Sequence, residues 1–185
     1  WEQNNLKKIF FKDSSKVREG IGIFHRVSLN GNGIYSQKLN IIEAKYRLFN
    51  YYFPYHKKIK EILKKKKNVY KEVFIFDVHS MSSKIVSNDV DIILSNGDGK
   101  TSNCKIIEKV KKVFERNNYT VILNNPFKGG FICHYYGEPK CNIHATQIEI
   151  NKKNYMCEKS LKIKKEKMTK LKLCFSNIIQ IFNKN

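Results

Sequence analysis

Several features that define other classes of protein are missing from this sequence. No run of apolar residues approaches the ~18 to 20 that a membrane span requires, so we expect a soluble protein without a membrane partner. Residues 1–5 contain neither an initiator methionine nor the apolar region of a signal peptide. We therefore expect either a fragment or a protein that has lost its beginning.

Cysteine usage excludes two further classes. The five cysteines are an odd number and show no Cys-x-x-Cys spacing, which argues against a disulfide framework and against a zinc ribbon. Reduced thiols are the simplest account of them. The sequence accordingly predicts a cytoplasmic protein.

Arginine is scarce although the formal net charge is +20. Of the 36 basic residues, four are arginine, and nucleic-acid sites depend on the planar guanidinium group. Lysine, asparagine and isoleucine are also what an AT-rich coding sequence supplies. We interpret the charge as a solvated lysine-rich surface and expect no nucleic-acid partner. A basic nucleic-acid-associated protein stays open as an alternative, and the sequence carries no indication of oligomeric state.

The remaining composition predicts one folded domain. The chain has 185 residues, 41% of them hydrophobic, with neither an internal repeat nor a Pro/Gly-rich linker, so we expect a single domain over residues 1–185. Periodicity alternates between helical and extended segments, which predicts an α/β fold with a central mixed, largely parallel sheet flanked by helices. Strands are expected at 73–76, 90–94, 119–123 and 145–150, and helices at 39–63, around 106–114 and at 158–182.

Local signals support the helices. Asn40 and Glu43 have the spacing of a capping box at the start of the first helix, and Pro54 must kink or divide it. The second helix carries an apolar stripe formed by Ile106, Ile107, Val110, Val113 and Phe114.

Polar residues follow or interrupt the predicted strands. Because ligands bind beyond the carboxyl ends of strands in α/β sheets, we expect a site where 77–80, 124–130 and 147–151 meet. Strand alternation places Asp77 beside His79, and Gln147 on the same face as Glu149. A carboxylate in an apolar strand must be paired, protonated or functional. The alternative for His79 is a hydrogen-bonded structural histidine. For Glu149 the alternatives are a buried ion pair or a position on an edge-strand face.

These segments, in this order, resemble the N-formylglutamate amidohydrolase family. The similarity runs from about Gly20 to the C-terminus, and its motifs are Gly-Ile-Tyr at 33–35, Glu43, Arg47, Tyr-Tyr-Phe-Pro-Tyr-His at 51–56, Val-Phe-Ile-Phe-Asp-Val-His-Ser-Met at 73–81, Asp-Ile-Ile-Leu-Ser-Asn-Gly-Asp-Gly at 91–99, Asn-Pro-Phe-Lys-Gly-Gly at 125–130, Tyr-Gly-Glu-Pro at 136–139, His-Ala-Thr-Gln-Ile-Glu-Ile-Asn at 144–151 and Tyr-Met at 155–156.

The resemblance implies a fold like that of the zinc carboxypeptidases and phosphorylase/hydrolase-like proteins. It also implies a zinc-dependent amidohydrolase that releases formate, or another small acyl group, from an N-acyl amino acid such as N-formyl-L-glutamate. His79 would be a zinc ligand. Glu149 would be the general base that takes a proton from the attacking water and delivers it to the leaving amine.

Candidate substrate-binding residues follow from the carboxylates of such a substrate. Arg26 and Lys128 supply cations, and the adjacent Gly129 and Gly130 supply exposed amides. Asn125 begins the same motif, and His144 is a further candidate to line the site. For Lys128 and His144, a surface lysine and a structural histidine are the open alternatives.

The resemblance fails in several places. It implies two more zinc ligands, a His and an acidic residue, from a segment near the N-terminus, but no His-x-x-Glu or similar pair precedes His79. Ser95 stands where the family usually has glycine, and Lys152 where arginine is typical. His134 follows the Gly-Gly turn where the family often has arginine, and it would be a weaker, pH-dependent partner for a carboxylate. A non-catalytic remnant or binding protein of the same fold is therefore an alternative function.

Overall fold

The computed structural model describes residues 18, 22–28, 31–37, 39–87 and 89–183. Contacts within the chain divide it into two compact units, Trp1–Ile62 and Leu63–Asn185, and each is described by itself. The single domain predicted from the sequence stays a prediction. Among the described helices, none combines the length with the apolar character that crossing a membrane requires.

The predicted helix at 39–63 changes its hydrogen-bond pattern before its proline. It forms α3 (Ile41–Arg47), a π-helical turn (Leu48–Tyr52) and α4 (Phe53–Val69). The Glu43 backbone N–H donates to Asn40 Oδ1 over 2.8 Å, so the expected N-terminal cap is present. Proline removes a backbone donor, and Pro54 stands at the second position of α4, directly after the wider π turn. The backbone stays helical through the π turn, so the chain is not divided at Pro54, and the kink predicted there stays a prediction. α4 runs past the predicted end.

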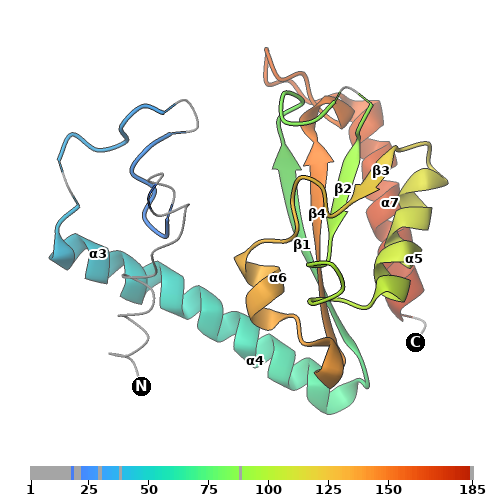
Figure 1. Cartoon of the computed structure of the whole chain (residues 1–185), viewed down its shortest axis with the longest axis horizontal. Coiled ribbons are helices and arrows are strands. Elements are labelled where there is room, and N and C mark those ends of the chain that lie inside the picture. The colour runs from blue at the N-terminus through green and yellow to red at the C-terminus, as the bar shows by residue number, and fades with distance from the viewer. Residues whose placement is uncertain (1–17, 19–21, 29–30, 38, 88, 184–185) are drawn as a thin grey trace. The chain divides into compact units, whose positions relative to one another are not determined.

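The second unit contains a mixed four-stranded sheet in the order β1-β4-β2-β3, formed by β1 (Val73–Met81), β2 (Ile92–Ser95), β3 (Val121–Leu123) and β4 (Ile143–Asn151) (Figure 1). β1 pairs with β4 in parallel and β2 with β3 in parallel, whereas β2 and β4 are antiparallel. The predicted α/β fold with a mixed central sheet is confirmed.

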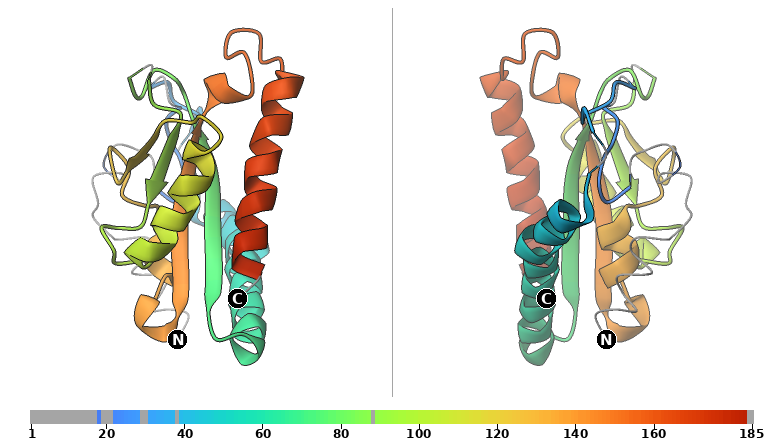
Figure 2. Two further views of the ribbon diagram at one scale, coloured as in Figure 1. Left: turned by 90° about the vertical axis from the view of Figure 1, so that its right-hand side faces the viewer. Right: turned by 90° about the vertical axis from the view of Figure 1, so that its left-hand side faces the viewer.

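Two helices cover one face of this sheet and a short helix lies against the other. α5 (Cys104–Glu115) and α7 (Lys165–Asn183) stand side by side over the first face, as two views show (Figures 1 and 2). α6 (Phe131–Tyr136) lies on the opposite side. The main core fills the space under α5 and α7, and all five residues of the predicted apolar stripe of α5 are buried in it. This packing leaves the α6 face for polar side chains.

Several predicted boundaries are wrong. β1 continues to Met81 because it pairs with β4 along its whole length, so residues 77–80 lie inside the strand. α7 begins at Lys165, because residues 157–164 form a turn in which the Cys157 N–H donates to the Lys162 carbonyl over 2.8 Å. Leu161 in this turn is exposed and has a φ of 56°, a left-handed conformation that a helix excludes. The 3-10 turns Pro139–Cys141 and Lys152–Asn154, and α6, were not predicted.

Candidate active site

The polar residues gather on a face of the sheet, which corrects the expectation that they meet beyond its carboxyl edge. β2 and β3 run opposite to β4, so their carboxyl ends lie at the other end of the sheet from those of β1 and β4. The carboxyl end of β2 therefore meets the middle of β4, where Ser95 is the Cα partner of Gln147. The loop after β3 reaches the same place, because a Cβ atom on Gly130 would be 2.9 Å from Gln147 Oε1. Alternation along each strand turns the polar side chains to the face that carries α6.

Four polar residues of β1 and β4 form the centre of the site. Asp77 is the Cα partner of Gln147, and His79 is the Cα partner of Glu149. Such directly opposed side chains on one sheet face lie close enough to interact. His79 Nε2 lies 2.9 Å from Asp77 Oδ1, so the predicted contact between these two residues is present.

Glu149 is a buried carboxylate with one defined partner. Its relative exposure is 8%, and Gln147 Nε2 donates to its Oε1 over 2.7 Å. Burial raises the pKa of Glu149, and the nearby Asp77 carboxylate adds to this, whereas His79 and the Gln147 hydrogen bond act in the opposite direction. A carboxylate whose pKa is raised holds a proton more strongly, which suits a group that must accept one from water.

The Gly-Gly turn lies against these residues. A Cβ atom on Gly130 would be 2.9 Å from Gln147 Oε1 and 3.9 Å from Asp77 Oδ2. Gly129 has a φ of +109°, a conformation that favours glycine. The structure thus brings both predicted glycines to the Asp77–Glu149 face.

Cys133 follows the turn on α6 and is fully buried. Burial, with a further contribution from Asp77, raises the pKa of its thiol to about 12. Since the thiolate is the nucleophilic form of cysteine, Cys133 is unsuited to attack a substrate.

The loop between β3 and the Gly-Gly turn is held from several sides. Ser95 Oγ donates to the Phe127 carbonyl over 2.6 Å, and Asn124 exchanges hydrogen bonds with Asn96. Asn125 precedes Pro126 through a cis peptide bond and is exposed. Lys128 Nζ lies 2.8 Å from Asp98 Oδ2, in an exposed ion pair. Lys128 therefore already has a carboxylate partner from the neighbouring loop.

His144 does not join the site. It lies five residues before Glu149 on β4, about 16 Å along the strand, and on the opposite face. Its Nδ1 accepts a hydrogen bond from the Asn103 N–H over 3.3 Å, and its Nε2 lies 3.7 Å from Glu72 Oε1. Burial lowers the pKa of this histidine. The expectation that His144 lines the substrate site is corrected: it serves as a hydrogen-bonded structural residue.

Arg26 and His134 are the two other candidates. Arg26 belongs to the first unit, where its carbonyl accepts from the Ile34 N–H over 2.9 Å, and its substrate role stays a prediction. His134 lies between two loop glycines: its ring atoms would be 2.9 Å from a Cβ on Gly97 and 3.5 Å from one on Gly129. It is thus near the Gly-Gly turn, as the sequence suggested.

The described part of the chain does not provide a complete metal centre. No group of three or more His, Cys, Asp or Glu side chains with metal-binding geometry occurs among the described residues. A catalytic zinc takes three protein ligands. The described residues offer His79 with its Asp77 partner, so they do not fit a catalytic zinc by themselves.

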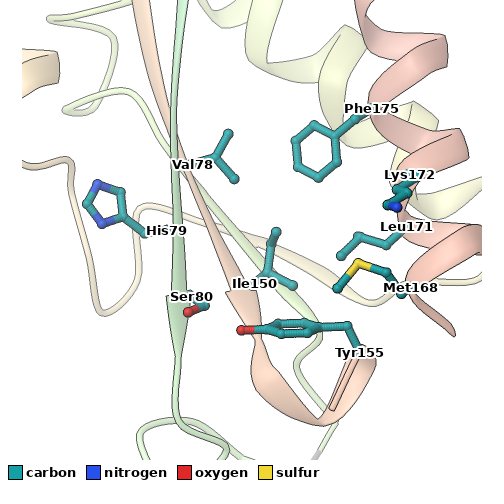
Figure 3. Close-up of a pocket in the computed structure, with 9 residues that line it drawn as sticks. All are labelled: Val78, His79, Ser80, Ile150, Tyr155, Met168, Leu171, Lys172 and Phe175. Atoms are coloured by element: carbon teal, nitrogen blue, oxygen red, sulfur yellow. The ribbon is translucent and has the colours of Figure 1, made fainter. Parts of the chain in front are cut away.

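An apolar groove of about 580 Å³ lies on the other side of β1, lined by Val78, Ser80, Ile150, Tyr155, Met168, Leu171, Lys172 and Phe175, with His79 at its margin. Figure 3 shows Val78 turned toward α7 and His79 turned away from it, to the opposite side of the strand. The groove is therefore separated from the Glu149 face by β1 itself.

Gln147 is the site residue that the sequence analysis did not select. It was placed on the face of Glu149, but no role was assigned to it. The strand alternation that marked Glu149 as a buried polar residue marks Gln147 in the same way, because it lies two residues earlier on the same face. A buried amide needs hydrogen-bond partners, so the sequence could have indicated Gln147 as a site residue.

Comparisons with known proteins agree with this architecture. The model of the family described as N-formylglutamate amidohydrolase matches residues 4–156. The chain is 31% identical over 121 residues to the N-formylglutamate deformylase of Pseudomonas putida, which covers 63% of this chain and 45% of that protein. It is 30% identical over 112 residues to the deformylase of Pseudomonas aeruginosa, covering 58% and 42%. The matches thus span less than half the length of these curated relatives.

Solved structures give the same picture. The crystal structure of N-formylglutamate amidohydrolase from Ralstonia eutropha JMP134 matches with a TM-score of 0.83 and 25% identity, over 91% of this chain and 63% of that one. A gene product of Agrobacterium tumefaciens matches with a TM-score of 0.61 at 15% identity, over 85% and 62%. The second likeness shows the fold alone.

Proposed function

The chain belongs to the N-formylglutamate amidohydrolase family, and from this premise we propose that the whole protein releases formate from N-formyl-L-glutamate or a closely related N-acyl amino acid. The observation that carries the proposal is the cross-strand pair of His79 and Glu149, supported by Asp77 and Gln147. A buried carboxylate beside a histidine can supply a general base for the hydrolysis of an amide.

Glu149 is the proposed general base. It takes a proton from a water molecule that attacks the formyl carbon, and it then delivers the proton to the amide nitrogen as the C–N bond breaks. The products are formate and the free amino acid. Gln147 holds one carboxylate oxygen of Glu149 through its hydrogen bond of 2.7 Å, so the other oxygen remains for the proton transfer.

His79 is the proposed zinc ligand. Asp77 engages its Nε2, which fixes the proton there and presents Nδ1 as the nitrogen with a lone pair. A bound zinc ion would act as a Lewis acid and would make water a stronger nucleophile. Because the described residues alone do not complete a zinc centre, no step is assigned to the metal. The remaining ligands would come from outside the described residues.

The substrate carboxylates need positive or N–H partners. We propose that the backbone of Gly129 and Gly130 contributes amides, since the turn lies against the catalytic face. Asn125 and Lys128 lie on the same loop, and Lys128 would exchange Asp98 for a substrate carboxylate. The substrate role predicted for Arg26 stays a prediction from the sequence.

Formate release and metal content test the proposal together. Both are measured on this chain and on a form extended to the length of the curated relatives. The extended enzyme is expected to contain about one zinc per chain, in line with a single catalytic site. It should release formate from N-formyl-L-glutamate and lose both properties on His79→Ala.

His56→Ala is the matched control and should keep zinc and activity. A metal-free extended protein that cleaves no N-formyl amino acid would reject the catalytic reading and favour a non-catalytic protein of this fold.

A further inference from the structure

Gln147 is enclosed more tightly than Asp77, His79 and Glu149, the other three residues at the centre of the site. Its relative exposure is 5%, and its Cα partners are Asp77 on β1 and Ser95 on β2. Its Nε2 donates to Glu149 Oε1 over 2.7 Å. A carboxylate accepts hydrogen bonds and, when ionised, cannot donate them, so this bond fixes the orientation of the amide. The carbonyl oxygen Oε1 must then point away from Glu149.

This carbonyl oxygen is buried without a hydrogen-bond partner among the described residues. Buried acceptors are normally satisfied, because an unpaired one loses its hydration without compensation. Gly130 lies directly in front of it, where a side chain would place a Cβ atom 2.9 Å from Oε1. Oε1 thus faces the Gly-Gly turn with almost no accessible surface and with an unmet need for a donor. A donor reaches it when the turn shifts aside, and glycine at this position leaves out the Cβ atom that would stand in the way.

The proposed substrate carries the matching group. An N-formyl amino acid at neutral pH has ionised carboxylates and a formyl oxygen, which all accept hydrogen bonds, and its scissile amide N–H is its one strong donor. We infer that Gln147 recognises the scissile amide of the substrate: Oε1 accepts the amide N–H while Nε2 holds Glu149 beside the same bond. This inference rests on the proposed function.

One side chain would thus place the substrate nitrogen next to the base that later protonates it. Because the two ends of a single rigid amide make both contacts, the distance between base and leaving group is set by Gln147. A compound that lacks the N–H would leave Oε1 unpaired, and a site built around a hydrogen bond discriminates against such an analogue. Gln147 would then select amides over the corresponding esters.

The test compares two substrates in the extended enzyme. One is N-formyl-L-glutamate, and the other is its oxygen analogue, the O-formyl ester of 2-hydroxyglutarate, which has no N–H. Gln147→Met is expected to lower kcat/KM for the amide by about 10- to 100-fold more than for the ester. Each substrate is referred to its own wild-type value, so the higher intrinsic reactivity of the ester cancels.

Thr146→Val is the matched control. Thr146 neighbours Gln147 on β4, is 1% exposed and has a hydroxyl that finds no partner within the described part of the chain, but it faces the other side of the sheet. It should leave the amide-to-ester ratio unchanged. Gly130→Ala provides a second variant should Gln147→Met not fold, because its Cβ atom blocks Oε1 without removing Gln147; it should lower the same ratio.

Equal losses on both substrates would overturn the inference alone, since Gln147 would then act only by holding Glu149. A wild-type enzyme that releases formate from neither compound would overturn the proposed function, and this inference with it.

Discussion

His79 and Glu149 are Cα partners in the parallel pair of β1 and β4, and both side chains lie on the face that also carries Asp77 and Gln147. They are 70 positions apart in the sequence, so the sheet alone makes them neighbours. Each is then fixed by a residue two positions earlier on its own strand, Asp77 for His79 and Gln147 for Glu149. The site therefore consists of two pairs, Asp77 with His79 on β1 and Gln147 with Glu149 on β4. The register of the two strands places these pairs side by side.

Replacing the base is expected to affect turnover more than binding. Glu149→Gln removes the proton acceptor but keeps the size of the side chain, so kcat in the extended enzyme should fall by about 10²- to 10⁴-fold with little change in KM. Initial rates of formate release measure this. Glu108→Gln, on α5, is the control and should keep full activity. A Glu149→Gln variant with near-normal kcat would show that another group takes the proton.

The core beneath α5 should respond strongly to truncation. Phe114 is fully buried among residues of α7 and the sheet, so Phe114→Ala is expected to lower the free energy of unfolding by about 3–5 kcal/mol. Ile179→Ala on α7 removes a side chain that is 55% exposed, so it should change the free energy of unfolding by less than about 0.5 kcal/mol. Urea unfolding followed by circular dichroism compares the two. Similar losses would contradict the assigned core.

Gly137 after α6 should tolerate no side chain. A Cβ atom there would lie 2.6 Å from the backbone carbonyl oxygens of Cys133 and Thr101, which cannot rotate away. Gly137→Ala is expected to destabilise the fold by about 1–3 kcal/mol, the usual range for overpacking. In Gly33→Ala the nearest atom would be 4.0 Å away, so this control should be close to neutral. Thermal unfolding of both variants decides the point.

Glu158 should make stability depend on pH in the acid range. Hydrogen bonds from Ser83 and Ser82 lower its pKa from 4.5 to about 2. Because the folded pKa is depressed, the stabilisation is complete above the unfolded value and is lost as the pH falls from 4.5 through about 2. The difference in free energy of unfolding between wild type and Glu158→Gln should be constant above about pH 6 and shrink below 4.5.

Urea titrations at several pH values measure the difference in free energy of unfolding between wild type and Glu158→Gln. A difference that stays constant down to pH 2 would mean that the Ser82 and Ser83 contacts do not favour the ionised form. Ser160→Ala, in the same turn, is the control and should preserve the wild-type pH profile.

Sequence alone determined the elements and the chemistry they carry. The apolar stripe of α5 predicted a buried helix face, because a period of 3.6 residues fixes which side chains share a side. The period of two along a strand likewise placed Asp77 beside His79 and marked Glu149 as a carboxylate in apolar surroundings. These are local relations, and backbone geometry enforces them whatever the rest of the chain does.

Only the tertiary structure decided which strands are neighbours and in which direction they run. The antiparallel pairing of β2 with β4 moved the site from the edge of the sheet to its face, and it brought the Gly-Gly turn against Gln147. The pairing of β1 with β4 also includes His144 near the start of β4, away from Glu149, and it continues along β1 past His79 to Met81. Strand order and register arise from contacts between distant segments, which no local period encodes, and the unpartnered oxygen of Gln147 exists only once those segments have met.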